Sequence, residues 1–174
     1  VLVDGRDVKS YRQEDLRKKI GLVPQKSTLF SGSIRDNLSW AKSDASLADM
    51  ERACKISQAH DFVTSLEDGY DFVLEEGGSN LSGGQIQRLA IARALVGQGD
   101  FLLMDDSLSA LDYKTDRNLR RALKEDGKKR TTIIVSQRIS GIKEADKILV
   151  MDKGEIVDQG SHEELLSRSD VYQK

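Results

Sequence analysis

Cysteine and proline are each present only once in this sequence, and neither sign of charge dominates. The single cysteine, Cys54, excludes an internal disulfide and indicates a reducing compartment. Because Cys54 stands at helical spacing from Met50 and Ala53, we expect it to be a small buried thiol. With 27 Lys and Arg against 29 Asp and Glu, no basic excess points to nucleic acid, and no apolar run is long enough to span a bilayer.

What remains is a globular composition of 174 residues, with 38% hydrophobic and 32% charged residues, enough for one domain or two small subdomains. Short apolar runs alternate with helical patterns at both ends of the chain, which favours an α/β fold with a mostly parallel sheet. The expected strands are residues 1–3, 20–23, 101–104, 131–135 and 147–151. The runs 101–104 and 131–135 are short and lack alternation, so we expect both to be buried.

Residues 26–96, between the two ends, are predicted to be almost purely helical. We therefore expect an α/β core formed by residues 1–25 and 97–174, with residues 26–96 inserted as an α-helical subdomain. Several helices are expected to begin with a Ser followed three residues later by Gln, Asp or Glu, which is the pattern of a capping box. These pairs are Ser10 with Gln13, Ser33 with Asp36, Ser82 with Gln85, and Ser161 with Glu164. The two histidines, His60 and His162, stand at helix starts, where we expect them at the surface and outside any catalytic site.

The helix that begins at Ser82 opens on Gly83 and Gly84, although each glycine costs about 1 kcal/mol in a helix relative to Ala. Without Cβ atoms, their N–H groups can come close to a ligand. A helix N-terminus with a Ser hydroxyl suits an anion, so we predict an anion site here. The alternative is a glycine turn that merely opens a buried Ala/Leu helix.

Polar residues also cluster where the expected strands end, at Gln25, at Asp105 and Asp106, and at Gln137. In open parallel sheets, ligands bind at the carboxyl ends of the strands. An Asp that follows a buried run is costly unless it is paired or bound to a metal, and Mg²⁺ is the natural partner for such oxygens. The alternative is that Asp105 and Asp106 are N-cap acids at a strand–helix turn.

With these motifs in view, the chain resembles the nucleotide-binding domain of ATP-binding cassette (ABC) transporters, which has a P-loop NTPase (RecA-like) core. The matching stretches are LSGGQ at 81–85 (the signature), FLLMDD at 101–106 (Walker B), SALD at 109–112 (the D-loop) and Val23-Pro24-Gln25 (the Q-loop). Residues 29–38 and 160–166 are similar to the exporter branch of the family.

The resemblance implies how the signature segment would act. Ser82, Gly83, Gly84 and Gln85 would contact the γ-phosphate of an ATP molecule held by a partner nucleotide-binding domain. Asp112 would communicate across the interface between the two domains. ATP would join the domains, and hydrolysis would release them.

The resemblance also implies a metal and a membrane partner. Asp105 would hold Mg²⁺ through water, and Gln25 would approach that metal and couple to transmembrane helices. The loop of residues 75–78 lies where exporters contact their membrane domains. We expect the protein to lie at the cytoplasmic face of a membrane, tethered by transmembrane domains that this sequence does not contain.

Three features depart from the family pattern. The phosphate-binding string GxxxxGK[ST] is absent from the sequence, which we interpret as truncation before Val1. A strand would then be missing between residues 131–135 and 147–151, and we expect this chain alone to bind ATP negligibly and to be inactive. Asp106 stands where the family has a catalytic Glu, and Gln137 stands where the family has a His.

A shorter carboxylate at Asp106 would pull the base back, and a misplacement of about 1 Å can cost about 100-fold in rate. The amide of Gln137 can hydrogen-bond a phosphate but cannot take up a proton near pH 7. The catalytic candidates Asp106, Gln137 and Gln25 therefore suggest the weakened half of a heterodimeric exporter. Alternatives are a homodimeric exporter with slow hydrolysis by Asp106, and a non-transport ABC regulatory or scaffold protein.

Overall fold

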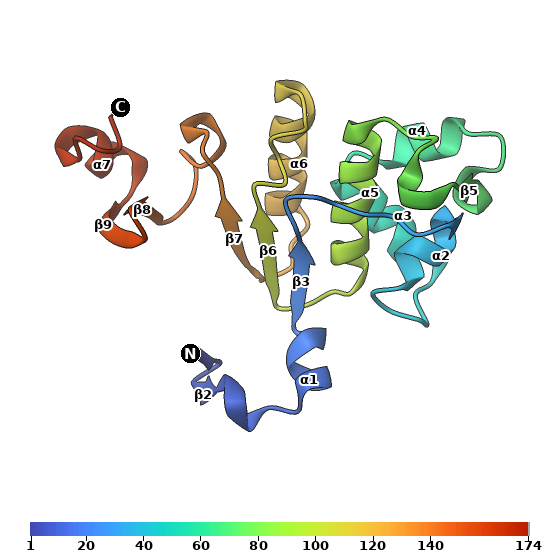
Figure 1. Ribbon diagram of the computed structural model, residues 1–174, viewed down its shortest axis with the longest axis horizontal. Coiled ribbons are helices and arrows are strands. Elements are labelled where there is room, and N and C mark those ends of the chain that lie inside the picture. The colour runs from blue at the N-terminus through green and yellow to red at the C-terminus, as the bar shows by residue number, and fades with distance from the viewer. Residues whose placement is uncertain (174) are drawn as a thin grey trace. The chain divides into compact units, whose positions relative to one another are not determined.

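The computed structural model describes residues 1–173, the side chain of Ser140 excepted, as two compact units (Figure 1). The first unit comprises residues 1–135 and the second begins at Ser136. Within the described residues, no helix is both long and apolar enough to cross a membrane. The division expected from the sequence, with a core of residues 1–25 and 97–174 and a helical subdomain of 26–96, stays a prediction.

The central sheet of the first unit consists of β3 (Ile20–Val23), β6 (Phe101–Asp105) and β7 (Thr131–Val135), in the order β3-β6-β7. Both pairs are parallel, with Ile20 opposite Phe101 and Phe101 opposite Thr131. Figure 1 shows the three arrows running side by side in the same direction. The α/β fold with a parallel sheet that we expected from the sequence is therefore confirmed.

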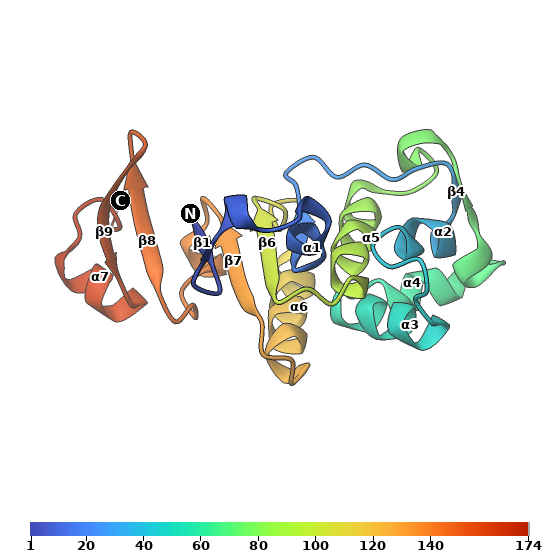
Figure 2. The same cartoon turned by 90° about the horizontal axis from the view of Figure 1, so that it is seen from below.

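Helices α1 (Gln13–Lys18), α5 (Gly83–Val96) and α6 (Tyr113–Glu125) accompany this sheet. A Cβ atom at Gly21 of β3 would stand 2.8 Å from the carbonyl oxygen of Ala94 in α5, so glycine allows the close approach of strand and helix. Figure 2 shows α5 on the side of β6 that faces away from β7. The core of the unit contains Leu89 of α5 and Leu119 of α6, both at most 1% exposed.

Short helices fill the chain between β3 and α5. They are α2 (Ile34–Ser39), α3 (Leu47–Ile56) and α4 (His60–Ser65), with the 3₁₀ turns Gly69–Asp71 and Glu76–Gly78 and the two-stranded ribbon of β4 (Gly32–Ser33) and β5 (Val73–Leu74). Cys54 on α3 is completely buried, as predicted. A second small ribbon, β1 (Leu2–Val3) with β2 (Arg6–Asp7), precedes a 3₁₀ turn at Val8–Ser10.

Three of the four predicted capping boxes are confirmed, and one is wrong. Ser33, Ser82 and Ser161 each accept a hydrogen bond from the residue three positions later, whose side chain bonds back to the Ser backbone. Ser10 instead donates its hydroxyl to the Asp7 carbonyl oxygen (2.7 Å) at the end of the 3₁₀ turn. Helix α1 begins three residues after Ser10, at Gln13, and its N-cap Arg12 forms no side-chain cap.

The prediction that residues 131–135 form a buried strand is wrong for the burial. Ile133 is 47% and Val135 is 55% exposed, and only Ile134 packs against the core. β7 has one neighbour, β6, among the strands of residues 1–173, and four of its five residues are exposed. The expected missing strand between residues 131–135 and 147–151 stays a prediction.

The second unit is built on the antiparallel hairpin of β8 (Ile148–Asp152) and β9 (Glu155–Gly160), with a 3₁₀ turn at Ile139–Gly141 and α7 (His162–Arg168). Its small core contains Ile148, Val150, Leu165 and Tyr172.

The surface position expected for the two histidines is met only in part. Nδ1 of His60 lies 3.0 Å from the Tyr70 hydroxyl, and Nδ1 of His162 lies 2.9 Å from the Tyr172 hydroxyl. Both rings are half-buried, because each helix start packs against a tyrosine that stands ten residues later in the chain.

Candidate functional site

The N-terminus of α5 carries a capping box formed by Ser82 and Gln85. The Ser82 hydroxyl accepts from the Gln85 N–H (3.3 Å), and the Gln85 side-chain oxygen accepts from the Ser82 N–H (2.8 Å). Gly83 and Gly84 lie between Ser82 and Gln85, in the first turn of the helix. Their backbone N–H groups therefore have no hydrogen-bond acceptor within the helix. This geometry holds two backbone donors rigidly in a helix N-terminus, where the helix dipole favours an anion.

Neither glycine is required by the packing of the protein. A Cβ atom at Gly83 would meet nothing within 4 Å, and one at Gly84 would meet only the Ala110 carbonyl oxygen, at 3.8 Å. Ser82 and Gly83 are exposed, whereas the middle of the same helix is buried. Two glycines that cost helix stability without serving the core favour the ligand-site hypothesis over a simple glycine turn.

A second group of predicted site residues meets at the carboxyl ends of β3 and β6. Asp105 is the exposed last residue of β6. The next residue, Asp106, has the left-handed backbone conformation (φ +42°), and its N–H donates to the Val135 carbonyl oxygen of β7 (3.0 Å). Nε2 of Gln25 donates to Oδ2 of Asp106 (3.4 Å), although the two residues are 81 positions apart. The fold thus brings Gln25 and Asp106 together.

The backbone of Asp106 is held by the turn that follows. The Asp106 carbonyl oxygen accepts from the Ser109 N–H (3.3 Å) and from the Ser109 hydroxyl (2.8 Å). A positive φ is uncommon outside glycine, and Asp is among the residues that tolerate it. This local geometry turns the chain sharply after the sheet, so that two adjacent carboxylates follow one strand end.

Asp112 has a different role from the two strand-end carboxylates. It is the N-cap of α6 and accepts from the N–H (3.0 Å) and the hydroxyl (2.6 Å) of Thr115. These hydrogen bonds lower the pKa of Asp112. Since Asp112 caps the helix, the alternative that Asp105 and Asp106 are its N-cap acids is wrong.

The start of α5 and the turn before α6 also approach each other, as the 3.8 Å between a Gly84 Cβ and the Ala110 oxygen shows. Sequence reasoning missed Arg88, which reinforces this region. Its Nε donates to the Gly84 carbonyl oxygen (3.2 Å) and its Nη1 to that of Gln58 (2.8 Å). The sequence feature that could have identified Arg88 is its position beside the apolar residues of a helix.

The remaining candidate, Gln137, lies in the second unit. It is exposed, and it sits in a tight turn where the Ser136 hydroxyl accepts from the Arg138 N–H (3.0 Å). The structure therefore assembles Gln25, Asp105 and Asp106 in one unit, and describes Gln137 within the other.

The strand-end residues suit a metal ion that is coordinated mainly by water and phosphate oxygens. Among the residues that the structure describes, no three His, Cys, Asp or Glu side chains are grouped to hold a metal ion. Asp105 and Gln25 nevertheless offer hard oxygen atoms. This sparse set fits Mg²⁺, which usually binds through one or two carboxylates together with water and phosphate oxygens.

Comparison with known proteins agrees with this fold. The family model "ABC transporter" matches residues 1–109, and the chain belongs to the ABC transporter family. It is 47% identical, over all 174 residues, to the uncharacterized ABC transporter ATP-binding protein YknU of Bacillus subtilis, of which it covers 30%. It is 44% identical over 173 residues to the ATP-dependent lipid A-core flippase of Pseudomonas aeruginosa, covering 99% of this chain and 29% of the flippase.

Among solved structures, a bacterial Atm1-family ABC exporter with ATP bound is similar over 99% of this chain and 30% of that exporter, with a TM-score of 0.94 and 41% identity. The expected ABC core fold and the exporter-type resemblance are thereby confirmed. The chain spans about 30% of the length of these relatives.

Proposed function

We propose that this chain forms part of the ATP-binding, energy-coupling domain of an ABC exporter, which pairs with a second such domain around ATP and Mg²⁺. The observation that carries the proposal is the start of α5, where Ser82, Gly83 and Gly84 are rigid, largely exposed and unneeded for packing. Backbone donors presented in this way suit a phosphate brought by another subunit.

At the strand ends, Asp105 and Gln25 would hold the Mg²⁺ that accompanies ATP, and the metal would neutralise charge on the transferred phosphate. Asp106 would accept the proton of the attacking water. In the structure, the Asp106 carboxylate already receives a hydrogen bond from Gln25, so the two side chains act on the same space. Asp112, anchored to Thr115, would orient the turn that faces the partner domain.

We further propose that this chain's own hydrolytic site is weakened and that its partner is a different chain. Asp106 is one methylene shorter than Glu, and its backbone is tied to Val135 and Ser109, so the carboxylate has little freedom to reach further. Gln137 would supply an amide where proton exchange is needed. Both changes lower hydrolysis at this site without touching the start of α5.

The proposed membrane contacts are Gln25 and the loop of residues 75–78, at the cytoplasmic face of the membrane. Gly77 and Gly78 both have left-handed backbones, with φ of +67° and +75°, so this loop has a tight, defined shape. Glu75 and Glu76 are exposed on it. A shaped acidic loop and a glutamine at a strand end offer two contacts to transmembrane domains.

The test compares variants in the full-length transporter paired with its partner, measured by ATP hydrolysis. Ser82→Arg and Gly84→Asp should reduce the rate by about 100-fold or more, because each blocks donors aimed at a charged group in the transition state. Asp106→Ala should reduce it much less. As a matched control, Ser46→Arg removes the same kind of cap, on α3, and should leave the rate unchanged.

Equal losses from Gly84→Asp and Asp106→Ala would show that this chain's own site carries the hydrolysis, as in a homodimeric exporter. A loss from Ser46→Arg as large as that from Ser82→Arg would mean that helix capping, rather than phosphate contact, explains the effect.

A further inference from the structure

Helix α6 (Tyr113–Glu125) has an outer face on which positive charges are arranged in a line. Lys114, Arg117, Arg121 and Lys124 are all exposed, and they follow one another at intervals of three, four and three residues. At about 100° per residue, this spacing places them on one face of the helix, in a line about 15 Å long. We call these four residues the basic line.

The segment around the basic line differs in charge from the rest of the sequence. Residues 113–130 contain 8 Lys and Arg against 3 Asp and Glu, whereas the whole chain has 27 against 29. The other residues of the chain therefore have an acidic balance, with 19 Lys and Arg against 26 Asp and Glu. A negatively charged partner that is attracted to this segment must be narrow, because a broad one would also meet acidic surface.

The carboxylates of this segment leave the basic line largely uncompensated. Asp116 pairs with Arg120 (2.8 Å), and neither side chain is more than 20% exposed. Asp126, just beyond the end of the helix, has 4% of its side chain exposed. Within α6 the exposed carboxylate is that of Glu125, which lies 3.9 Å from Arg121. Four exposed cations thus share one exposed carboxylate.

The basic line is unfavourable for the helix that carries it. Like charges three and four residues apart repel each other, and a solvated helix face normally carries both signs. Lys114 also lies in the first turn, where the positive end of the helix dipole disfavours a cation. The inner face of α6 packs through Leu119, which is in the core, and through Ala122 and Leu123. Because this packing does not use the basic line, the line points to a contact with another molecule.

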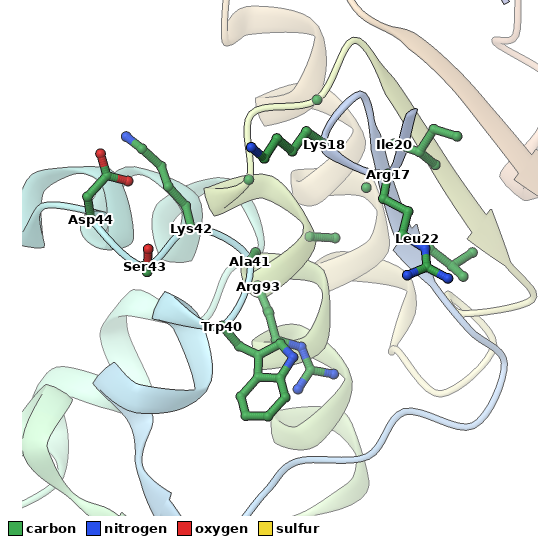
Figure 3. A pocket seen from close by; sticks show the side chains of 14 residues that line it. Arg17, Lys18, Ile20, Leu22, Trp40, Ala41, Lys42, Ser43, Asp44 and Arg93 are labelled. Carbon is green, nitrogen blue, oxygen red and sulfur yellow. The ribbon is translucent and has the colours of Figure 1, made fainter. Parts of the chain in front are cut away.

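Cations elsewhere in the first unit are arranged differently. Arg17, Lys18, Lys42 and Arg93 border a hollow of about 690 Å³, and they come from α1, from the loop of residues 40–44 and from α5. Figure 3 shows that these side chains point in different directions. The cations of the basic line, by contrast, share one face of one helix.

An exposed aromatic ring lies at one end of the basic line. Tyr113 is 69% exposed and precedes Arg117 by about one helical turn. Tyr and Arg are among the residues that contribute most to protein–protein binding, because they combine apolar area with a polar group. A tyrosine ring offers a contact to an apolar side chain, which a simple anion lacks. The combination favours a polypeptide partner.

We propose that the basic line binds an acidic α-helix of a partner polypeptide, which lies alongside α6 with an apolar side chain against Tyr113. A helix with Asp or Glu at the same intervals presents its carboxylates in a matching straight line. A nucleic acid or an anionic membrane is broader and would also meet the acidic remainder of the chain. None of the residues that we assign to nucleotide or metal binding belongs to the basic line, so its use does not depend on ATP.

The probe is a synthetic helical peptide with a fluorescent label, with Glu at alternating intervals of three and four residues and Leu at each end. The control peptide has the same composition with its Glu residues distributed around the helix, and circular dichroism checks that both are equally helical. Fluorescence anisotropy measures binding to the full-length protein in nanodiscs of zwitterionic lipid, without nucleotide. We expect the ordered peptide to bind at least about tenfold more tightly than the control, and added salt to weaken it.

Two double variants that remove the same amount of charge test the assignment. Lys114→Gln with Arg117→Gln should weaken binding of the ordered peptide by about two- to thirtyfold, as expected for two solvent-exposed ion pairs. Arg12→Gln with Lys55→Gln removes two exposed cations outside the basic line and should leave binding unchanged.

Equal binding of the two peptides, or equal effects of the two double variants, would overturn the proposal, because the attraction would then come from charge in general. A DNA duplex and empty nanodiscs that contain phosphatidylserine are the remaining probes. If either binds with the same dependence on Lys114 and Arg117 while the ordered peptide does not bind, the assignment to an acidic helix is wrong. Absence of binding by every probe would also refute it.

Discussion

Replacing Gly83 by Ala should make this protein more stable and less active, and the two effects have separate causes. An added Cβ atom would meet nothing within 4 Å, and Gly83 does not have a positive φ, so the native backbone accommodates Ala. Replacing glycine by alanine at such a helical position stabilises by about 0.4 to 1 kcal/mol. The same methyl group would stand in front of the backbone donors that we assign to a phosphate.

Gly21→Ala is the matched control, because its Cβ atom would stand 2.8 Å from the backbone oxygen of Ala94. Overpacking of this kind costs about 1 to 3 kcal/mol. Urea unfolding of both variants measures the stability change, and ATP hydrolysis of the full-length paired protein measures the function. We expect Gly83→Ala to unfold at higher urea and to hydrolyse at least about tenfold more slowly. A variant that is destabilised, or one that keeps full activity, would refute the reasoning about Gly83.

Three further predictions concern the stability and reactivity of single groups. The hydrogen bonds from Thr115 lower the pKa of Asp112, so their stabilising effect is present above the unfolded pKa of about 3.9 and is lost as the pH falls through the lower folded value. Asp112→Asn should therefore flatten the acid side of a plot of unfolding free energy against pH. Burial raises the pKa of Cys54 to about 12. A thiol reagent at pH 8 should therefore label Cys54 only as fast as the first unit opens. Immediate labelling of the folded chain would contradict the structure. The Asp126 side chain is 4% exposed and pairs with both Arg52 and Arg130. Asp126→Asn should lower the free energy of unfolding by about 3 to 5 kcal/mol, because it leaves the two arginines without their acid. Urea unfolding measures this loss, with Glu125→Gln as the exposed control.

Much of the local structure could be predicted from the sequence, because its determinants lie within a few residues of each other. The capping boxes at Ser33, Ser82 and Ser161 each involve a side chain and a backbone group three residues apart, so residue type and spacing were sufficient. Ser10 failed because a competing acceptor, the Asp7 carbonyl, lies equally near in the chain. The parallel sheet could be predicted because short apolar runs alternate with helices.

Burial and contacts between distant segments could not be predicted in this way, since they depend on which elements become neighbours. Apolar residues 131–135 suggested a covered strand, but exposure of Ile133 follows from the number of strands beside β7. The Gln25 amide reaches Asp106 only because β3 and β6 are paired in register.

The start of α5 combines both kinds of information. Its cap and its glycines were evident in the sequence, since they are local. That Gly83 and Gly84 have space around them, and are therefore free to serve a ligand as we propose, was decided by the packing of residues far away in the chain.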